Sequence, residues 1–151
     1  MVFKPHPKSE ARKRSAVTLI KCLLAEKNNP AVLSAHCQEL LDVLLWKITE
    51  AESSKYKTRF QSQGTLRRRN EVKLRHDHVF ERSKMIAALE KAASHEVDGI
   101  LKNAIGCTVT VEEHARLSKF DKAYDGWTRY QKAKVKVINT QTGKRVAFDL
   151  D

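Results

Sequence analysis

Three successive residues in one short run of this chain have side chains that can bind a divalent metal or transfer a proton. The run extends from Leu74 to Arg82 and contains His76, Asp77 and His78. Imidazole nitrogens and carboxylate oxygens are common ligands of divalent ions, and histidine is the most frequent general base in enzymes. The triplet therefore indicates a metal site or a proton-transfer site.

The geometry of this triplet depends on the secondary structure that carries it. On an extended strand, His76 and His78 project to one face and Asp77 projects to the other. On a helix, Asp77 instead shares a face with Glu81, four residues later. No Gly or Pro lies near the triplet, so the sequence leaves both alternatives open.

A further side chain of metal-ligating type follows a strong helix-start signal. Thr110-Val111-Glu112-Glu113 has the pattern of a capping box, in which Thr and Glu each satisfy a free backbone N–H. The pattern predicts a helix whose first turns carry His114. The resulting candidate metal ligands are Asp77, His114 and His76.

These segments resemble a known family of nucleases. Asp77-His78-Val79 and the stretch from Thr108 to His114 are similar to the two ends of the HNH (ββα-metal) endonuclease motif, in particular to the colicin-type DNases. The resemblance implies that Asp77 binds the metal, that His78 is the general base activating water, and that His114 is a further ligand. The implied cofactor is a divalent ion, Mg²⁺, Mn²⁺ or Zn²⁺; without catalysis no cofactor is expected.

The charge of the chain indicates a polyanionic partner. Lys and Arg number 29 and Asp and Glu number 18, which gives a net charge of +11 over 151 residues. So large an excess attracts nucleic acid or an acidic protein surface. The chain has no Walker-type phosphate loop, no G-x-G-x-x-G and no G-x-S-x-G, so nucleotide hydrolysis, dinucleotide chemistry and α/β-hydrolase activity have no motif support.

The basic residues concentrate in two regions, one at the start of the first predicted helix and one after residue 53. In the second region, Tyr56 and Phe60 alternate with cations, a mixture that suits phosphate contact together with base stacking. The predicted nucleic-acid-binding residues are Arg12, Lys13, Arg14, Lys55, Tyr56, Lys57, Arg59, Arg67, Arg68, Arg69 and Arg75.

The hydrophobic pattern predicts a single α+β domain, mainly α. Residues 1–52 form a helical hairpin, with Asn29 capping the second helix and Pro30 in its first turn. Residues 53–75 form a basic loop or arm. Residues 76–151 form a mixed part with central helices and a small C-terminal β-hairpin, whose strands are Lys134–Asn139 and Arg145–Leu150.

These features support three functional hypotheses: a basic nucleic-acid-binding protein with a metal-dependent endonuclease centre, a non-catalytic DNA- or RNA-binding subunit of a larger assembly, and an immunity-type interaction protein that binds an acidic partner. The sequence does not distinguish DNA from RNA. No apolar run approaches the roughly 20 residues of a membrane span, and no secretory signal follows Met1. Three widely spaced cysteines suit reduced thiols, so a cytoplasmic location is expected.

Overall fold

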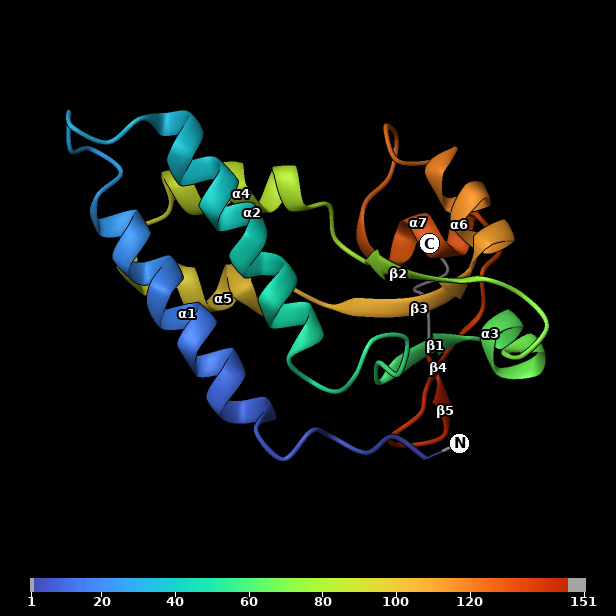
Figure 1. Ribbon diagram of the computed structural model, residues 1–151. Helices are drawn as coiled ribbons and strands as arrows, with labels where there is room; N and C mark the ends of the chain where they lie inside the picture. Colours follow the sequence, from blue (N-terminus) through green and yellow to red (C-terminus); the bar gives the residue numbers. More distant parts are fainter. Residues whose placement is uncertain (1, 147–151) are drawn as a thin grey trace.

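The computed structural model describes residues 2–146 and places a group of helices beside a small sheet (Figure 1). The fold is α+β and mainly α, as the sequence predicts. The helices are α1 (Ser9–Ala25), α2 (Ser34–Glu50), α3 (Gln63–Arg68), α4 (Arg82–Lys91), α5 (Val97–Leu101), α6 (Val111–Ser118) and α7 (Gly126–Lys132), with a 3-10 turn η1 (Ser94–Glu96). The strands are β1 (Phe60–Ser62), β2 (Leu74–His78), β3 (Gly106–Thr110), β4 (Val137–Asn139) and β5 (Lys144–Arg145).

The predicted N-terminal hairpin is confirmed: α1 and α2 lie side by side and run in opposite directions (Figure 1). Ile20 of α1 and Leu41 and Leu45 of α2 are fully buried between the helices and their neighbours. The apolar residues recur at three- and four-residue intervals, so one face of each helix is buried.

The turn between the two helices differs from the prediction. Helix α2 begins at Ser34, and its N-cap is Leu33 rather than Asn29. The Asn29 side-chain oxygen accepts a hydrogen bond from the Ala31 N–H at 2.9 Å, and the backbone carbonyl of Asn29 accepts one from the Val32 N–H. Asn29 therefore closes a turn with the adjacent backbone, a bonding pattern that competes with helix capping.

The sheet has the order β2-β3-β1-β4-β5. Strands β1 and β3 pair in parallel, and the other neighbours pair in antiparallel fashion. The strand β2 consequently forms one edge, and the predicted C-terminal hairpin consists of β4 and β5. The end of its second predicted strand lies outside the described residues.

The segment expected as a basic loop or arm, residues 53–75, contains regular structure. It holds β1, α3 and the start of β2. Ser62 caps α3 by accepting a hydrogen bond from the Thr65 N–H at 3.0 Å. The strand β1 is short and buries Gln61 completely, so no apolar periodicity reveals it.

Two hydrophobic clusters make up the interior. One joins α1, α2, α4 and α5, and the other joins the sheet to α6 and α7. Phe80, between β2 and α4, packs against both clusters. Within residues 2–146, no helix has the length and apolar character needed to cross a membrane.

Candidate functional site

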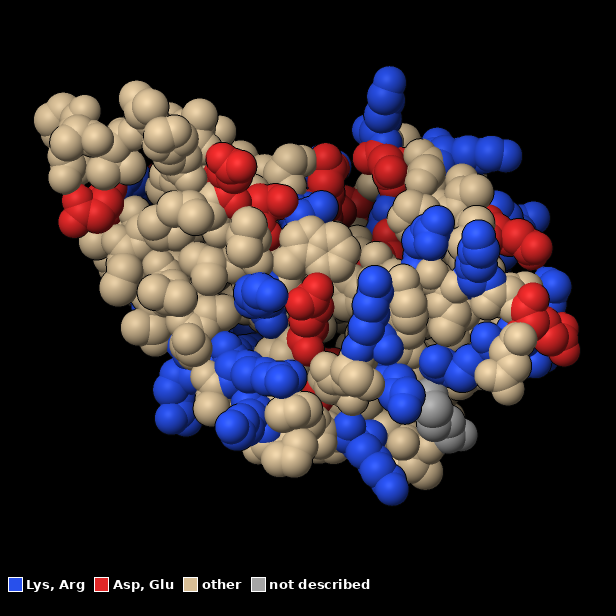
Figure 2. All heavy atoms as spheres, in the orientation of Figure 1, with Lys and Arg blue, Asp and Glu red and all other residues tan. Residues whose placement is uncertain are grey.

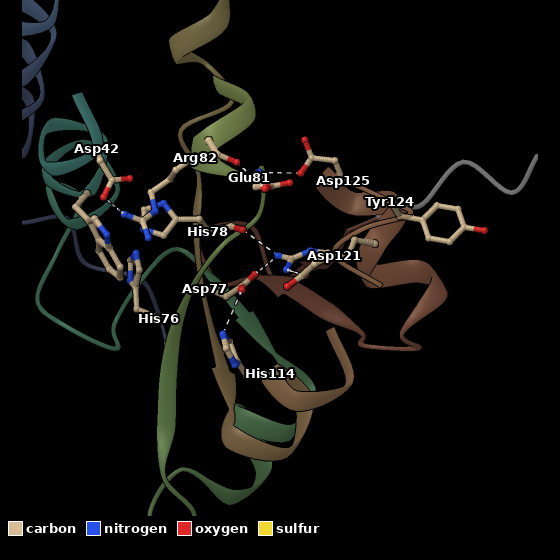
Figure 3. Close-up of a pocket in the computed structure, with 13 residues that line it drawn as sticks. Asp42, His76, Asp77, His78, Glu81, Arg82, His114, Asp121, Tyr124 and Asp125 are labelled. Carbon is tan, nitrogen blue, oxygen red and sulfur yellow. Dashed lines mark hydrogen bonds and ion pairs between the residues drawn. The ribbon is translucent and has the colours of Figure 1, made fainter. Parts of the chain in front are cut away.

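The triplet His76-Asp77-His78 lies on strand β2, so the strand alternative is correct. Asp77 faces Cys107 and His78 faces Gly106 on β3, while the opposite edge of β2 pairs with no other strand among residues 2–146. Because side chains alternate along a strand, the two His rings lie on one face and the Asp77 carboxylate on the other. Figure 3 shows this division.

Helix α6 delivers His114 to the Asp77 face. The predicted capping box is present, with the Glu113 N–H bonded to Thr110 Oγ1 and the Thr110 N–H bonded to Glu113 Oε2. This cap starts α6 directly after β3, and the helix packs on both β2 and β3. As a result, His114 Nε2 lies 3.7 Å from Asp77 Oδ1 (Figure 3).

The Asp77 carboxylate is held on its other oxygen by two buried side chains. Arg129 Nη2 and Tyr130 Oη both donate hydrogen bonds to Oδ2, and Arg129 also donates to the His78 carbonyl. Burial raises the pKa of Asp77 above its ordinary value, while the Arg129 charge and the Tyr130 hydrogen bond partly offset that rise. The carboxylate is therefore fixed in orientation, with Oδ1 directed toward His114.

The two histidines of the triplet pack against α2. The Trp46 ring lies 5.1 Å from His76 and 4.2 Å from His78, measured between centroids, and His76 Nε2 lies 3.0 Å from Thr49 Oγ1. Burial, together with the Arg82 charge, lowers the pKa of His76 to about 4 and that of His78 to about 3. Both rings are neutral at pH 7, and His78 Nε2 is buried without a hydrogen-bond partner.

Residues from both faces of β2 line one cleft of about 400 Å³ between the helical hairpin and α7. Three of its carboxylates are already engaged: Asp42 pairs with Arg82, Asp121 pairs with Arg129, and Asp125 accepts the Glu81 N–H. The cleft contains five carboxylates and two guanidinium groups, on a chain whose net charge is +11. Its net negative charge favours a cation over a bare phosphate.

Asp77 and His114 are the two candidate metal ligands that lie together in the structure. Their 3.7 Å separation is too long for a hydrogen bond, and both side chains are of a type that ligates such ions. His76 does not join them, because strand alternation places it on the opposite face beside Thr49. No group of three or more potential ligands occurs among residues 2–146. An imidazole beside a carboxylate suits Zn²⁺ better than Mg²⁺, because Mg²⁺ prefers oxygen ligands alone.

The predicted nucleic-acid-binding residues divide into exposed and internally bonded ones. Arg12, Lys13, Arg14, Lys55, Lys57, Arg67 and Arg75 are exposed. Arg68 is also exposed but pairs with Glu71 and Glu112, and Tyr56 is half-buried. Arg69 instead donates to the Tyr56 carbonyl and the Gln61 side chain, and Arg59 pairs with Glu52 at 3.4 Å. Arg69 therefore stabilises the segment before β1.

The sequence does not indicate the side chains that hold the triplet. Its pattern predicts a packed or surface role for Trp46. For the segment with Arg129 and Tyr130 it predicts closure of the core, or alternatively a partner or base-stacking surface. A weak signal is present on α2, where Asp42, Trp46 and Thr49 recur at helical spacing and so share one face.

Comparison with known proteins gave no match, whether with family models, with curated proteins or with solved structures. The chemistry of the cleft is therefore the basis for a functional assignment.

Proposed function

We propose that the protein is a metal-dependent nuclease that hydrolyses phosphodiester bonds in the cleft beside β2. The observation that carries the proposal is that Asp77 on β2 and His114 on α6 face each other, with 3.7 Å between Asp77 Oδ1 and His114 Nε2. The reaction class is taken from the resemblance to HNH endonucleases; β2 and β3 are antiparallel neighbours in the sheet, but α4, η1 and α5 lie between them in the chain, where the family has a β-hairpin. The carboxylate-rich cleft and the basic exterior suit a cation and a polyanionic substrate respectively.

Asp77 and His114 would hold the divalent ion, which when bound supplies stabilisation of negative charge on the scissile phosphate. Arg129 and Tyr130 orient the Asp77 carboxylate, so the pair needs little rearrangement. Arg75, two residues earlier on β2, projects to the same face as Asp77 and is exposed, in a position to contact a neighbouring phosphate.

His78 is the proposed general base. It is the last residue of β2 and lines the same cleft. Its ring lies on the face of β2 opposite the Asp77 carboxylate and its Nε2 is buried, so a proton from the attacking water would go to Nδ1. The positive charges of Arg82 and Arg129 contribute to its low pKa. An entering phosphate brings negative charge, which raises the pKa of this imidazole toward the working range.

Cleavage of plasmid DNA and structured RNA in Mg²⁺, Mn²⁺, Zn²⁺ or EDTA tests the proposal. We expect cutting that stops in EDTA and falls by about 10²- to 10⁴-fold in His78→Ala. His114→Ala should require more metal for the same rate. The His114 side chain is 40% exposed, so its removal leaves the core intact.

The matched control is His95→Ala, an exposed histidine of η1 that does not line the cleft. It should cut at the wild-type rate. A gel shift of nucleic acid without any cutting, equal in all variants, would refute the catalytic proposal and leave a binding protein.

A further inference from the structure

A second concave surface, the hairpin groove, lies between α1 and the C-terminal half of α2 and has a volume of about 750 Å³. Its rim carries four cations, Lys8, Arg12, Lys47 and Lys55, and one carboxylate, Glu50. Figure 2 shows Lys and Arg side chains gathered over the start of α1 and the loop after α2. The groove thus brings Lys8 and Arg12 of the first basic region together with Lys55 of the second.

The rim leaves most of its positive charge available to a ligand. Lys47 lies 3.9 Å from Glu50, whereas Lys8, Arg12 and Lys55 have no ion-pair partner among the described residues. Lys8 and Arg12 lie one turn apart at the start of α1 and Lys55 follows α2, so the cavity has cations from both helices' ends. A ligand with several regularly spaced negative charges matches them better than a single anion does.

The floor of the groove is apolar. Ala16 and Leu44 contribute to it, and Leu19 is 51% exposed although it lies on a helix of the core hairpin. An apolar floor inside a cationic rim matches a nucleic-acid strand whose bases are unpaired, because base faces are apolar and phosphates are anionic. A duplex hides its base faces in the stack and offers the floor nothing to cover.

We infer that the hairpin groove binds a single-stranded segment of nucleic acid, with bases on the floor and phosphates on the rim. The inference rests on the proposed function in one respect, that the bound strand leads to the cleft. Trp46 lines the cleft and the next residue, Lys47, lines the groove, so the two surfaces lie on neighbouring faces of α2. The substrate class is then nucleic acid with an overhang, loop or displaced strand.

Fluorescence anisotropy in EDTA tests the groove without cleavage. The probes are a labelled 20-residue oligodeoxythymidine and a blunt duplex of equal length. We expect the single strand to bind at least tenfold more tightly. Arg12→Ala/Lys55→Ala should weaken its binding roughly tenfold and reduce the salt slope by about 0.7 for each phosphate that the variant no longer neutralises.

Two further variants separate the rim from the floor. Leu19→Ser should weaken single-strand binding while leaving the salt slope unchanged, because it removes apolar surface and no charge. Lys91→Ala/Lys102→Ala removes two exposed lysines outside the groove and should bind as the wild type does. Equal affinity for both probes, no binding of either at low salt, or wild-type binding by Arg12→Ala/Lys55→Ala would overturn the inference.

Hydrolysis of bis(4-nitrophenyl) phosphate distinguishes failure of the groove from failure of the cleft. This small diester can enter the cleft without contacting the groove. Arg12→Ala/Lys55→Ala should therefore hydrolyse it at the wild-type rate, and His114→Ala should hydrolyse it more slowly. If the wild-type protein cleaves neither this diester nor nucleic acid but binds single strands through the groove, the proposed function fails and the groove assignment stands.

Discussion

At the scale of residues, the orientation of the Asp77 carboxylate depends on hydrogen bonds from Arg129 and Tyr130. The resemblance to the HNH motif implies that Asp77 and His114 bind one metal ion, and the two side chains lie 3.7 Å apart. The two residues that orient the Asp77 carboxylate, Arg129 and Tyr130, lie 52 and 53 positions later in the chain. No spacing rule links positions so far apart, because their contact depends on how α7 packs against the sheet.

Tyr130→Phe tests this orienting role. The Tyr130 hydroxyl is fully buried, and burial raises its pKa well above the ordinary value, so it remains a proton donor to Asp77. Without that donor the pKa of Asp77 rises further, and the carboxylate becomes protonated at a higher pH. We expect the acidic limb of the pH–rate profile for phosphodiester hydrolysis to move to higher pH, with a stability loss of about 1 kcal/mol.

Tyr124→Phe is the matched control for this prediction. Its phenol points away from Asp77 (Figure 3). The variant should keep the wild-type pH profile. If Tyr130→Phe loses stability but the acidic limb of its pH–rate profile does not move, Tyr130 contributes to core packing and does not affect the pKa of Asp77.

At the scale of elements, apolar periodicity predicts the long helices well and the short sheet elements poorly. The hairpin of α1 and α2 follows directly from repeated Leu and Ile positions. In contrast, β1 buries Gln61 and Ser62, and the Gln61 side chain is satisfied by hydrogen bonds with Thr58 and Arg69 instead of apolar packing. A strand stabilised by buried polar contacts has no hydrophobic signature.

The capping box of α6 is the element on which the position of His114 depends. Thr110→Ala removes the oxygen that accepts the Glu113 N–H, and should lower the free energy of unfolding by about 1 kcal/mol in a denaturant titration. It should also lower the apparent metal affinity, because the first turn of α6 carries His114. Thr110→Ser keeps the hydroxyl and should restore both properties; equal losses in the two variants would show that the Thr methyl group matters instead.

At the scale of the whole molecule, the triplet lies at the seam between the two hydrophobic clusters. His76 and His78 pack against Trp46 of the helical hairpin, and Arg82 covers the same Trp ring at 4.8 Å from its centroid. The two halves of the fold thus meet through neutral histidines beside a cation. Functional residues placed at such a seam also contribute to the stability of the molecule.

This arrangement makes stability depend on pH in a direction that follows from the two histidines. Their pKa values are about 4 and about 3 in the folded protein, below the ordinary value of 6.5. As the pH falls below about 6.5, the unfolded chain binds protons that the folded protein does not. The free energy of unfolding should therefore decrease from pH 6.5 to pH 4, by at most about 1.4 kcal/mol per pH unit for each histidine.

His78→Phe isolates one of these contributions. The variant keeps an aromatic ring against Trp46 and removes the buried nitrogen that has no partner. In urea titrations at several pH values, the free energy of unfolding should decrease less steeply toward low pH for His78→Phe than for the wild type. His36→Gln, which replaces an exposed histidine, should leave the decrease unchanged. If plots of the free energy of unfolding against pH are parallel for His78→Phe and the wild type, His78 binds protons equally in the folded and the unfolded protein. Other groups would then cause the loss of stability at low pH.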